Sequence, residues 1–126
     1  MVIANAICKP NEMGIAILLG AMALKKFTGT VVVIADSPEG QVPHYLLGRF
    51  GSDYGGRQYP VAAIPPSVKV ILMTAYPDRT LLDWFANPED GTIVCDWDAV
   101  MEMVRLHHGQ GTRAAVLPNA TMQYFG

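Results

Sequence analysis

Cysteine and charge are both scarce in this 126-residue chain. It has two cysteines, Cys8 and Cys95, which are too few for a disulfide framework. Both stand in apolar, strand-like segments, so we expect reduced, buried thiols and a cytoplasmic protein. Charged residues make up 16% of the chain, whereas about 25% is usual. This low charge predicts that part of the surface is covered by a partner chain or a neighbouring domain.

Long apolar runs and basic clusters are missing as well, which argues against membrane and nucleic-acid functions. The most apolar helical stretch, 13–24, is shorter than the roughly 20 residues that span a bilayer. It has no cationic face of the kind that holds a helix on a membrane surface, and no signal peptide is visible. The formal charge is −2 and the Lys and Arg residues are scattered, whereas nucleic-acid binding requires a basic stripe.

The motifs of several enzyme classes are also absent. Neither a serine nor a cysteine lies in a G-x-S-x-G turn, which argues against a hydrolase with a catalytic triad. His107 and His108 are adjacent, so on a helix they point about 100° apart, and no Cys or carboxylate stands at ligand spacing from them. We therefore expect no metal site in this chain and interpret both histidines as partly exposed residues at a helix end.

Short apolar segments alternate with helical ones along the chain. The expected strands are 2–7, 30–35, 68–74, 92–95 and 113–117, with a short last strand at 122–125. Continuous apolar strands separated by helices are typical of a parallel sheet that is covered on both faces. We predict a single α/β domain over 1–126, a three-layer α/β/α sandwich with a mainly parallel sheet of about five strands and right-handed crossovers.

The first helix is expected at 13–24. Asn11 precedes it as a plausible N-cap, Lys25 and Lys26 lie at its end, and Gly29 stops it. Its apolar residues cover nearly every face, which predicts burial on more than one side. Part of this helix would then face a neighbour outside the domain.

Three further helices are expected. Asp78 is placed to cap one at 79–86, and Asp96 is placed to cap the helix after the fourth strand. In that helix one core-facing stripe is predicted, formed by Trp97, Val100, Met101 and Val104. The remaining helix is expected at 42–50.

The segment 36–56 carries the most chemistry. It follows directly on the strand 30–35, and the loop that leaves the carboxyl end of such a strand is where ligands usually bind. His44 and Tyr45 fit either an acid/base pair or a histidine that caps or packs a helix start. The glycines from Gly48 to Gly56 fit an anion nest, but they match no nucleotide-binding motif. They fit a loop that orders against a partner at least as well.

Five parts of the chain are informative together: 2–6, 9–12, 36–41 with His44 and Tyr45, the glycine-rich tail that follows, and 115–120. They resemble the C-terminal domain of the nickel-pincer lactate racemase family. The resemblance covers nearly the whole chain but only the second half of a family member. It therefore implies that the chain is the C-terminal half of a longer, two-domain protein.

The family interconverts 2-hydroxy acids by hydride transfer to a nickel-containing pincer cofactor. The cofactor's lysine and histidine, and the two histidines that exchange the hydroxyl proton, belong to the N-terminal domain. By this resemblance the chain binds no cofactor alone and supplies no catalytic or metal-ligating residue. Its partners would be that N-terminal catalytic domain and a small 2-hydroxy acid, over which it closes as a lid. It would be inactive in isolation.

Seven residues are assigned to substrate contacts by this reading. They are Lys9, Asn11, Glu12, Glu39, Gln41, His44 and Tyr45. Lys9 is the candidate partner of a substrate carboxylate, and the alternative is an exposed loop lysine.

The chain departs from the family in its first helix. The lactate enzymes carry a Tyr-Gln-x-x-Lys set there, and an ungapped alignment places Ala16, Ile17 and Gly20 at those positions. The departure argues against lactate itself. It favours a larger or less polar 2-hydroxy acid, or recognition through Lys9, Asn11, Glu12 and the loop at 39–45.

A second hypothesis stays open. The chain also fits a non-catalytic α/β module that binds a small anionic ligand or forms a homo-oligomer through exposed apolar surface. The two hypotheses differ in whether a domain with paired histidines and a cofactor lysine is joined to the N-terminal side of this one.

Overall fold

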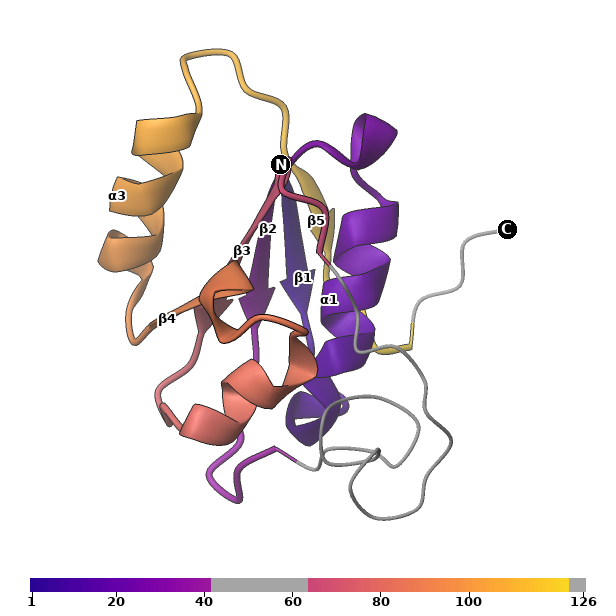
Figure 1. Ribbon diagram of the computed structural model, residues 1–126, viewed down its shortest axis with the longest axis vertical. Helices are drawn as coiled ribbons and strands as arrows, with labels where there is room; N and C mark the ends of the chain where they lie inside the picture. Colours follow the sequence, from indigo (N-terminus) through magenta and orange to yellow (C-terminus); the bar gives the residue numbers. More distant parts are fainter. Residues whose placement is uncertain (42–63, 123–126) are drawn as a thin grey trace.

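A five-stranded parallel sheet forms the centre of the molecule (Figure 1). The structure is a computed structural model and describes residues 1–41 and 64–122. The strands are β1 (Val2–Asn5), β2 (Gly29–Ile34), β3 (Val68–Met73), β4 (Gly91–Val94) and β5 (Ala115–Leu117). They are ordered β4-β3-β2-β1-β5, and each neighbouring pair is parallel. The predicted α/β class is confirmed.

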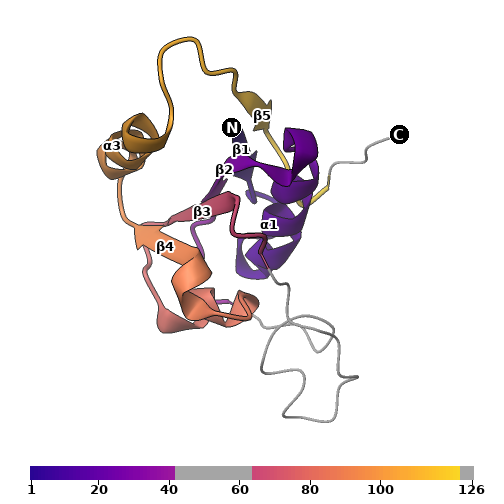
Figure 2. The ribbon, with the colours of Figure 1, turned by 45° about the horizontal axis from the view of Figure 1, so that its top comes forward.

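Two α-helices cover opposite faces of this sheet. Helix α1 (Met13–Met22) shares one cluster of buried side chains with Val31 and Val33, whereas Val32 belongs to a second cluster with α3 (Trp97–His107). Alternate residues of a strand point to opposite faces, so the two helices lie on different sides of β2. Figure 2 shows α1 and α3 separated by the sheet.

Short 3₁₀ segments complete the described connections. They are η1 (Pro10–Glu12), η2 (Lys25–Phe27), η3 (Arg79–Trp84) and η4 (Pro88–Asp90). Leu81, Trp84 and Phe85 are buried in the same cluster as α1. The α1 face of the sheet is therefore covered by both α1 and the η3 segment.

Small residues allow α1 to approach the sheet closely. A Cβ atom on Gly20 would stand 2.5 Å from Cγ1 of Val31 and 3.5 Å from Cβ of Ala4. Ala16 and Ala21 are buried on the same helix. The sequence of this helix is thus matched to one particular distance from the sheet, since larger side chains would push it away.

The two predicted aspartate caps are confirmed. Oδ1 of Asp96 accepts from the backbone N–H of Ala99 at 2.8 Å, and Oδ1 of Asp78 accepts from that of Thr80 at 2.9 Å. The segment after Asp78 is a 3₁₀ helix that ends at Trp84, earlier than expected.

The first helix differs from its prediction at both ends. No side chain of the preceding residues caps it, and Asn11 lies within η1. The helix ends at Met22, and the left-handed backbone of Lys26 and Phe27, with φ of 57° and 50°, follows. The two lysines therefore lie beyond the helix instead of in its last turn.

Two predictions of burial were wrong. Trp97 is 40% exposed, whereas Val100 and Val104 of the same helix are buried. The apolar stripe is narrower than predicted because α3 packs mainly against β3 and β4. Cys8 and Cys95 are both exposed, because β1 and β4 end before reaching them.

The helix expected at 42–50 lies outside the described residues, as do residues 123–125 of the expected last strand. Met122, the first residue of that expected strand, lies in a turn.

Candidate functional site

The connections that follow β1, β2, β3 and β5 meet at one edge of the sheet, which we call the carboxyl edge. They comprise residues 6–12, 35–41, 74–78 and 118–122. Parallel strands all end at the same edge, so loops far apart in sequence are brought together there. Five of the seven predicted contact residues lie in these connections: Lys9, Asn11, Glu12, Glu39 and Gln41.

Gln41 joins three of the segments at this edge. Its Oε1 accepts hydrogen bonds from the backbone N–H of Met13 and from Nε1 of Trp84, both at 3.2 Å. Its Nε2 donates to the carbonyl of Pro10 at 2.8 Å. Gln41 is buried, and a buried amide has to be hydrogen-bonded in this way. The residue predicted as a substrate contact therefore caps α1 and fixes the loop against it.

Lys9 and Glu12 form an ion pair in the connection between β1 and α1. Nζ of Lys9 lies 3.5 Å from Oε2 of Glu12, and the side chains are 46% and 26% exposed. A pair this exposed contributes little to stability. The ammonium group is held near the edge by a neighbour yet remains open to a second anionic partner.

The connection after β2 is fixed against the connection after β3. Oδ1 of Asp36 accepts from the backbone N–H of Ala75 at 2.7 Å, and Oγ of Ser37 donates to the carbonyl of Gly40 at 2.7 Å. Gly40 has φ of 78°, and a Cβ there would stand 3.1 Å from Oδ2 of Asp78. Glu39, at the tip of this loop, is exposed.

Asn119 brings the connection after β5 into the same edge. Its Nδ2 donates to Sγ of Cys8 at 3.0 Å, and the backbone N–H of Ala120 donates to the carbonyl of Asn5 at 2.7 Å. Asn119 and Cys8 were not among the predicted site residues. Each of them follows the end of a predicted strand. Because neighbouring parallel strands end side by side, this position in the sequence is the signal that could have identified them.

The carboxyl edge is mixed in charge. Among the described side chains of its connections, Lys9 supplies a positive charge and several carboxylates supply negative charge. These carboxylates belong to Glu12, Asp36, Glu39 and Asp78. Such a set can pair with one anionic group and also accept hydrogen bonds from hydroxyl groups.

The predicted residues His44 and Tyr45 lie outside the described residues, as do the glycines from Gly48 to Gly56. The described part of the site consists of the loops around Lys9 and Glu39.

The three positions that depart from the family in the first helix face the sheet. Ala16 is 0% exposed, Ile17 is 3% exposed, and Gly20 is packed against Val31. Polar side chains at these positions would lie under the helix, inside the domain. Their apolar character therefore agrees with packing against the sheet.

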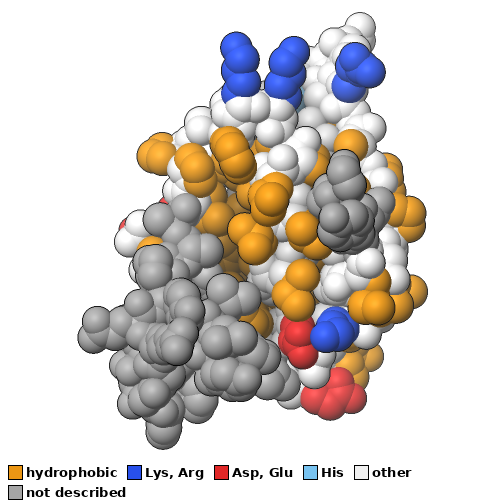
Figure 3. All heavy atoms as spheres, turned by 90° about the vertical axis from the view of Figure 1, so that its right-hand side faces the viewer, with side chains coloured by type: hydrophobic (Ala, Val, Ile, Leu, Met, Phe, Trp, Pro, Cys, Tyr) orange, Lys and Arg blue, Asp and Glu red, His pale blue; other side chains and the backbone are white. Residues whose placement is uncertain are grey.

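The other side of α1 carries an exposed apolar stripe, formed by Ile15, Leu18, Leu19 and Met22. Leu18 is 48% exposed and Met22 is 56% exposed, and the other two are half-buried. Figure 3 shows hydrophobic side chains gathered on the side of the molecule where α1 lies. This agrees with the expectation that the helix is apolar on more than its core side.

The described residues offer no donor set suited to nickel. Over 1–41 and 64–122, no three His, Cys, Asp or Glu side chains gather closely enough to hold a metal ion. In the same ranges no helix has the length and apolar character to cross a membrane.

No model of a known protein family matches the chain, and no curated protein matches it.

Proposed function

We propose that this chain is the substrate-contacting lid domain of a lactate racemase-like isomerase that acts on a 2-hydroxy acid. In this proposal an N-terminal domain of the same protein holds the nickel-pincer cofactor and the catalytic histidines. All hydride chemistry is assigned to that other domain, as the resemblance implies. The role of this chain is to bind and orient the substrate and to exclude water.

The observation that carries the proposal is the combination of charges at the carboxyl edge. A 2-hydroxy acid presents one carboxylate and, next to it, one hydroxyl group. Lys9 offers a cation for the carboxylate, and Glu12 lies 3.5 Å from that cation as an acceptor for the hydroxyl. The Gln41 bridge fixes the backbone at Pro10, between the two residues of this pair, and at Met13, directly after it, which favours a preformed arrangement.

The apolar stripe on α1 supports the second part of the proposal. Leu18 and Met22 are each about half exposed on a helix with no charged residue. An exposed apolar surface on a chain with so little charge is typical of an interface. Docking of the cofactor-bearing domain on this stripe would place it beside the carboxyl edge, because α1 begins there.

The test uses the protein encoded by the complete reading frame. Racemisation of a panel of 2-hydroxy acids is followed by chiral chromatography, together with metal analysis. Lys9→Gln should lower kcat/KM by about tenfold to a hundredfold, the usual effect of losing a charged hydrogen bond. Lys26→Gln, an exposed lysine beyond the other end of α1, is the control and should retain activity. Equal turnover by both variants, or a stop codon directly upstream of this chain, would contradict the proposal.

The alternative, a non-catalytic binding or oligomerisation module, is favoured by the same exposed stripe. It predicts that the purified chain forms a dimer in sedimentation experiments and that Leu18→Lys restores the monomer. A monomeric chain that binds its separately expressed N-terminal neighbour would exclude it.

A further inference from the structure

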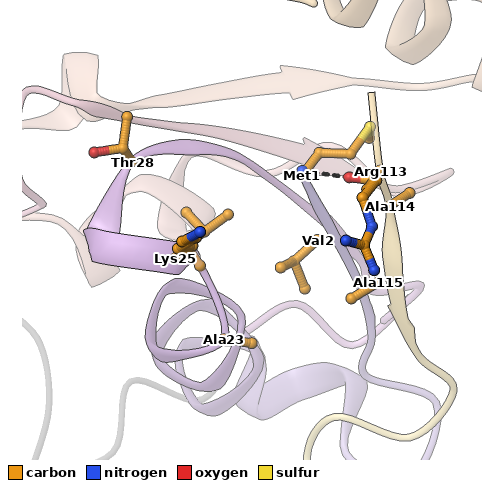
Figure 4. A pocket seen from close by; sticks show the side chains of 9 residues that line it. Met1, Val2, Ala23, Lys25, Thr28, Arg113, Ala114 and Ala115 are labelled. Atoms are coloured by element: carbon orange, nitrogen blue, oxygen red, sulfur yellow. Dashed lines mark hydrogen bonds between the residues drawn. The ribbon is translucent and has the colours of Figure 1, made fainter. Parts of the chain in front are cut away.

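A pocket lies at the opposite edge of the sheet, where the strands begin. Its volume is about 340 Å³, which falls within the range of small-molecule sites, roughly 300–1,000 Å³. It is lined by residues at the starts of β1 and β5 and in the segment that follows α1: Met1, Val2, Ala23, Leu24, Lys25, Thr28, Arg113, Ala114 and Ala115. We call it the amino-edge pocket (Figure 4).

The floor of this pocket is apolar and preformed. Val2 is 1% exposed and Leu24 is 6% exposed, and both belong to the main buried cluster of the domain. Three alanines contribute further apolar surface. Because Val2 and Leu24 are held in place by the core, this part of the pocket is formed before a ligand binds.

The rim of the pocket carries two cationic side chains. Figure 4 shows Val2 between Lys25, on the side of α1, and Arg113, which directly precedes β5. No carboxylate lines the pocket. Among the described residues the one ion pair joins Lys9 to Glu12, at the other edge of the sheet. Both rim cations are exposed and have no acidic partner within the described part of the chain.

The charges of the described residues are partly sorted between the two edges, and the exceptions are Lys9 at the carboxyl edge and Glu89 and Asp90 directly before β4. Basic residues lie at or near the amino edge: Lys25, Lys26, Arg105 and Arg113. Acidic residues follow the strand ends at the carboxyl edge: Asp36, Glu39, Asp78 and Asp96. Figure 3 shows basic side chains at one end of the α1 face, and acidic side chains with a basic one beside them near the opposite end. Such a distribution attracts an anion to the amino edge.

We propose that the amino-edge pocket binds a small aliphatic carboxylate. Arg113 binds the carboxylate group, since a guanidinium can donate two parallel hydrogen bonds to it, and Lys25 adds positive charge on the other side of the pocket. The hydrocarbon part lies on Val2, Leu24 and the alanines. The apolar floor selects such a ligand over a bare inorganic anion. The site lies at the opposite edge of the sheet from the carboxyl edge.

The test is a titration of the purified, isotope-labelled chain with hexanoate, followed by amide chemical shifts. Saturable shifts are expected for Val2, Ala23, Ala114 and Ala115, at constant ionic strength. Arg113→Gln and Lys25→Gln should each weaken binding by about tenfold. Both side chains are exposed, so the fold should survive, and an unchanged spectrum elsewhere verifies this. Lys9→Gln, at the other edge, is the matched control and should bind hexanoate as before.

Two further probes separate this proposal from simple charge or simple hydrophobicity. Inorganic phosphate and neutral hexanamide should both bind more weakly than hexanoate. Binding of phosphate as tight as that of hexanoate would show that charge alone acts, and equal binding of hexanamide would show that the cations have no part. Either result would overturn the proposal, as would the absence of saturable shifts or an equal loss of binding in Lys9→Gln.

Discussion

The indole N–H of Trp84 donates to the side-chain oxygen of Gln41 at 3.2 Å, across 43 residues of sequence. The same oxygen caps α1 through Met13, and the amide nitrogen binds the carbonyl of Pro10. One buried side chain therefore fixes the positions of the first helix, the loop after β2 and the η3 segment relative to one another. The geometry of the carboxyl edge depends on it.

Gln41→Ala should lower the free energy of unfolding by about 2–4 kcal/mol, because it removes a helix cap and leaves three buried or half-buried polar groups without their partner. Urea unfolding measures the loss. Glu39→Ala, two residues away on an exposed side chain, is the control and should change stability by less than about 0.5 kcal/mol. Equal effects of the two substitutions would show that the Gln41 bridge is not formed.

Gly20→Ala should also destabilise the domain, because the added methyl group would stand 2.5 Å from Cγ1 of Val31. Overpacking of this kind costs about 1–3 kcal/mol. Gly109→Ala is the matched control, since a Cβ there meets nothing within 4 Å. Combining Gly20→Ala with Val31→Ala should recover part of the loss, and strict additivity in this double-mutant cycle would contradict the contact.

The two tryptophans should differ in their access to a soluble quencher. Trp84 is 5% exposed and Trp97 is 40% exposed. The Trp97→Phe variant should therefore retain blue-shifted emission that iodide quenches poorly, whereas the wild-type protein should show an additional, easily quenched component. Equal quenching of wild type and variant would mean that Trp97 is buried as well.

Stability should fall as the pH drops below the ordinary pKa of histidine. Burial lowers the pKa of His108 below 6.5, and the positive charges of the amino terminus and His107 lower it further. The unfolded chain then binds a proton more readily than the folded one, so protonation favours unfolding. The stability contributed by neutral His108 is complete above pH 6.5 and is lost as the pH falls through the lowered pKa.

This pH dependence can be measured as the urea midpoint between about pH 7.5 and pH 5.5. His108→Gln should flatten the profile, because the Nε2 that lies 2.8 Å from Oγ1 of Thr30 is replaced by a group that does not titrate. His107→Gln, on an exposed neighbour, should keep most of the slope. A profile unchanged by His108→Gln would assign the effect to other groups.

Features set by local sequence could be predicted. Five apolar runs gave the five strands, and their continuous hydrophobicity indicated a parallel sheet covered on both faces. The caps by Asp78 and Asp96 involve partners two and three residues away, so they are visible in the sequence itself.

Features set by tertiary contacts could not be predicted in the same way. The structural role of Gln41 is not visible in the sequence, because its partners Met13 and Trp84 lie 28 and 43 residues away. The exposure of Trp97 depends on how far α3 extends over the sheet. The spacing of apolar residues along the helix does not indicate this extent. The carboxyl-edge loops were predicted to carry the site, and the structure places Lys9, Glu12 and Glu39 there. Their role in binding stays a prediction.

The pairing of β1 with β5 has a consequence for biosynthesis. Val2 lies opposite Ala115, so one side of β1 has no backbone partner until β5 has left the ribosome. During that interval the amide and carbonyl groups of an apolar strand edge are open to other chains. Premature termination anywhere before Ala115 would leave this edge permanently unpaired, and the truncated product would be prone to aggregate.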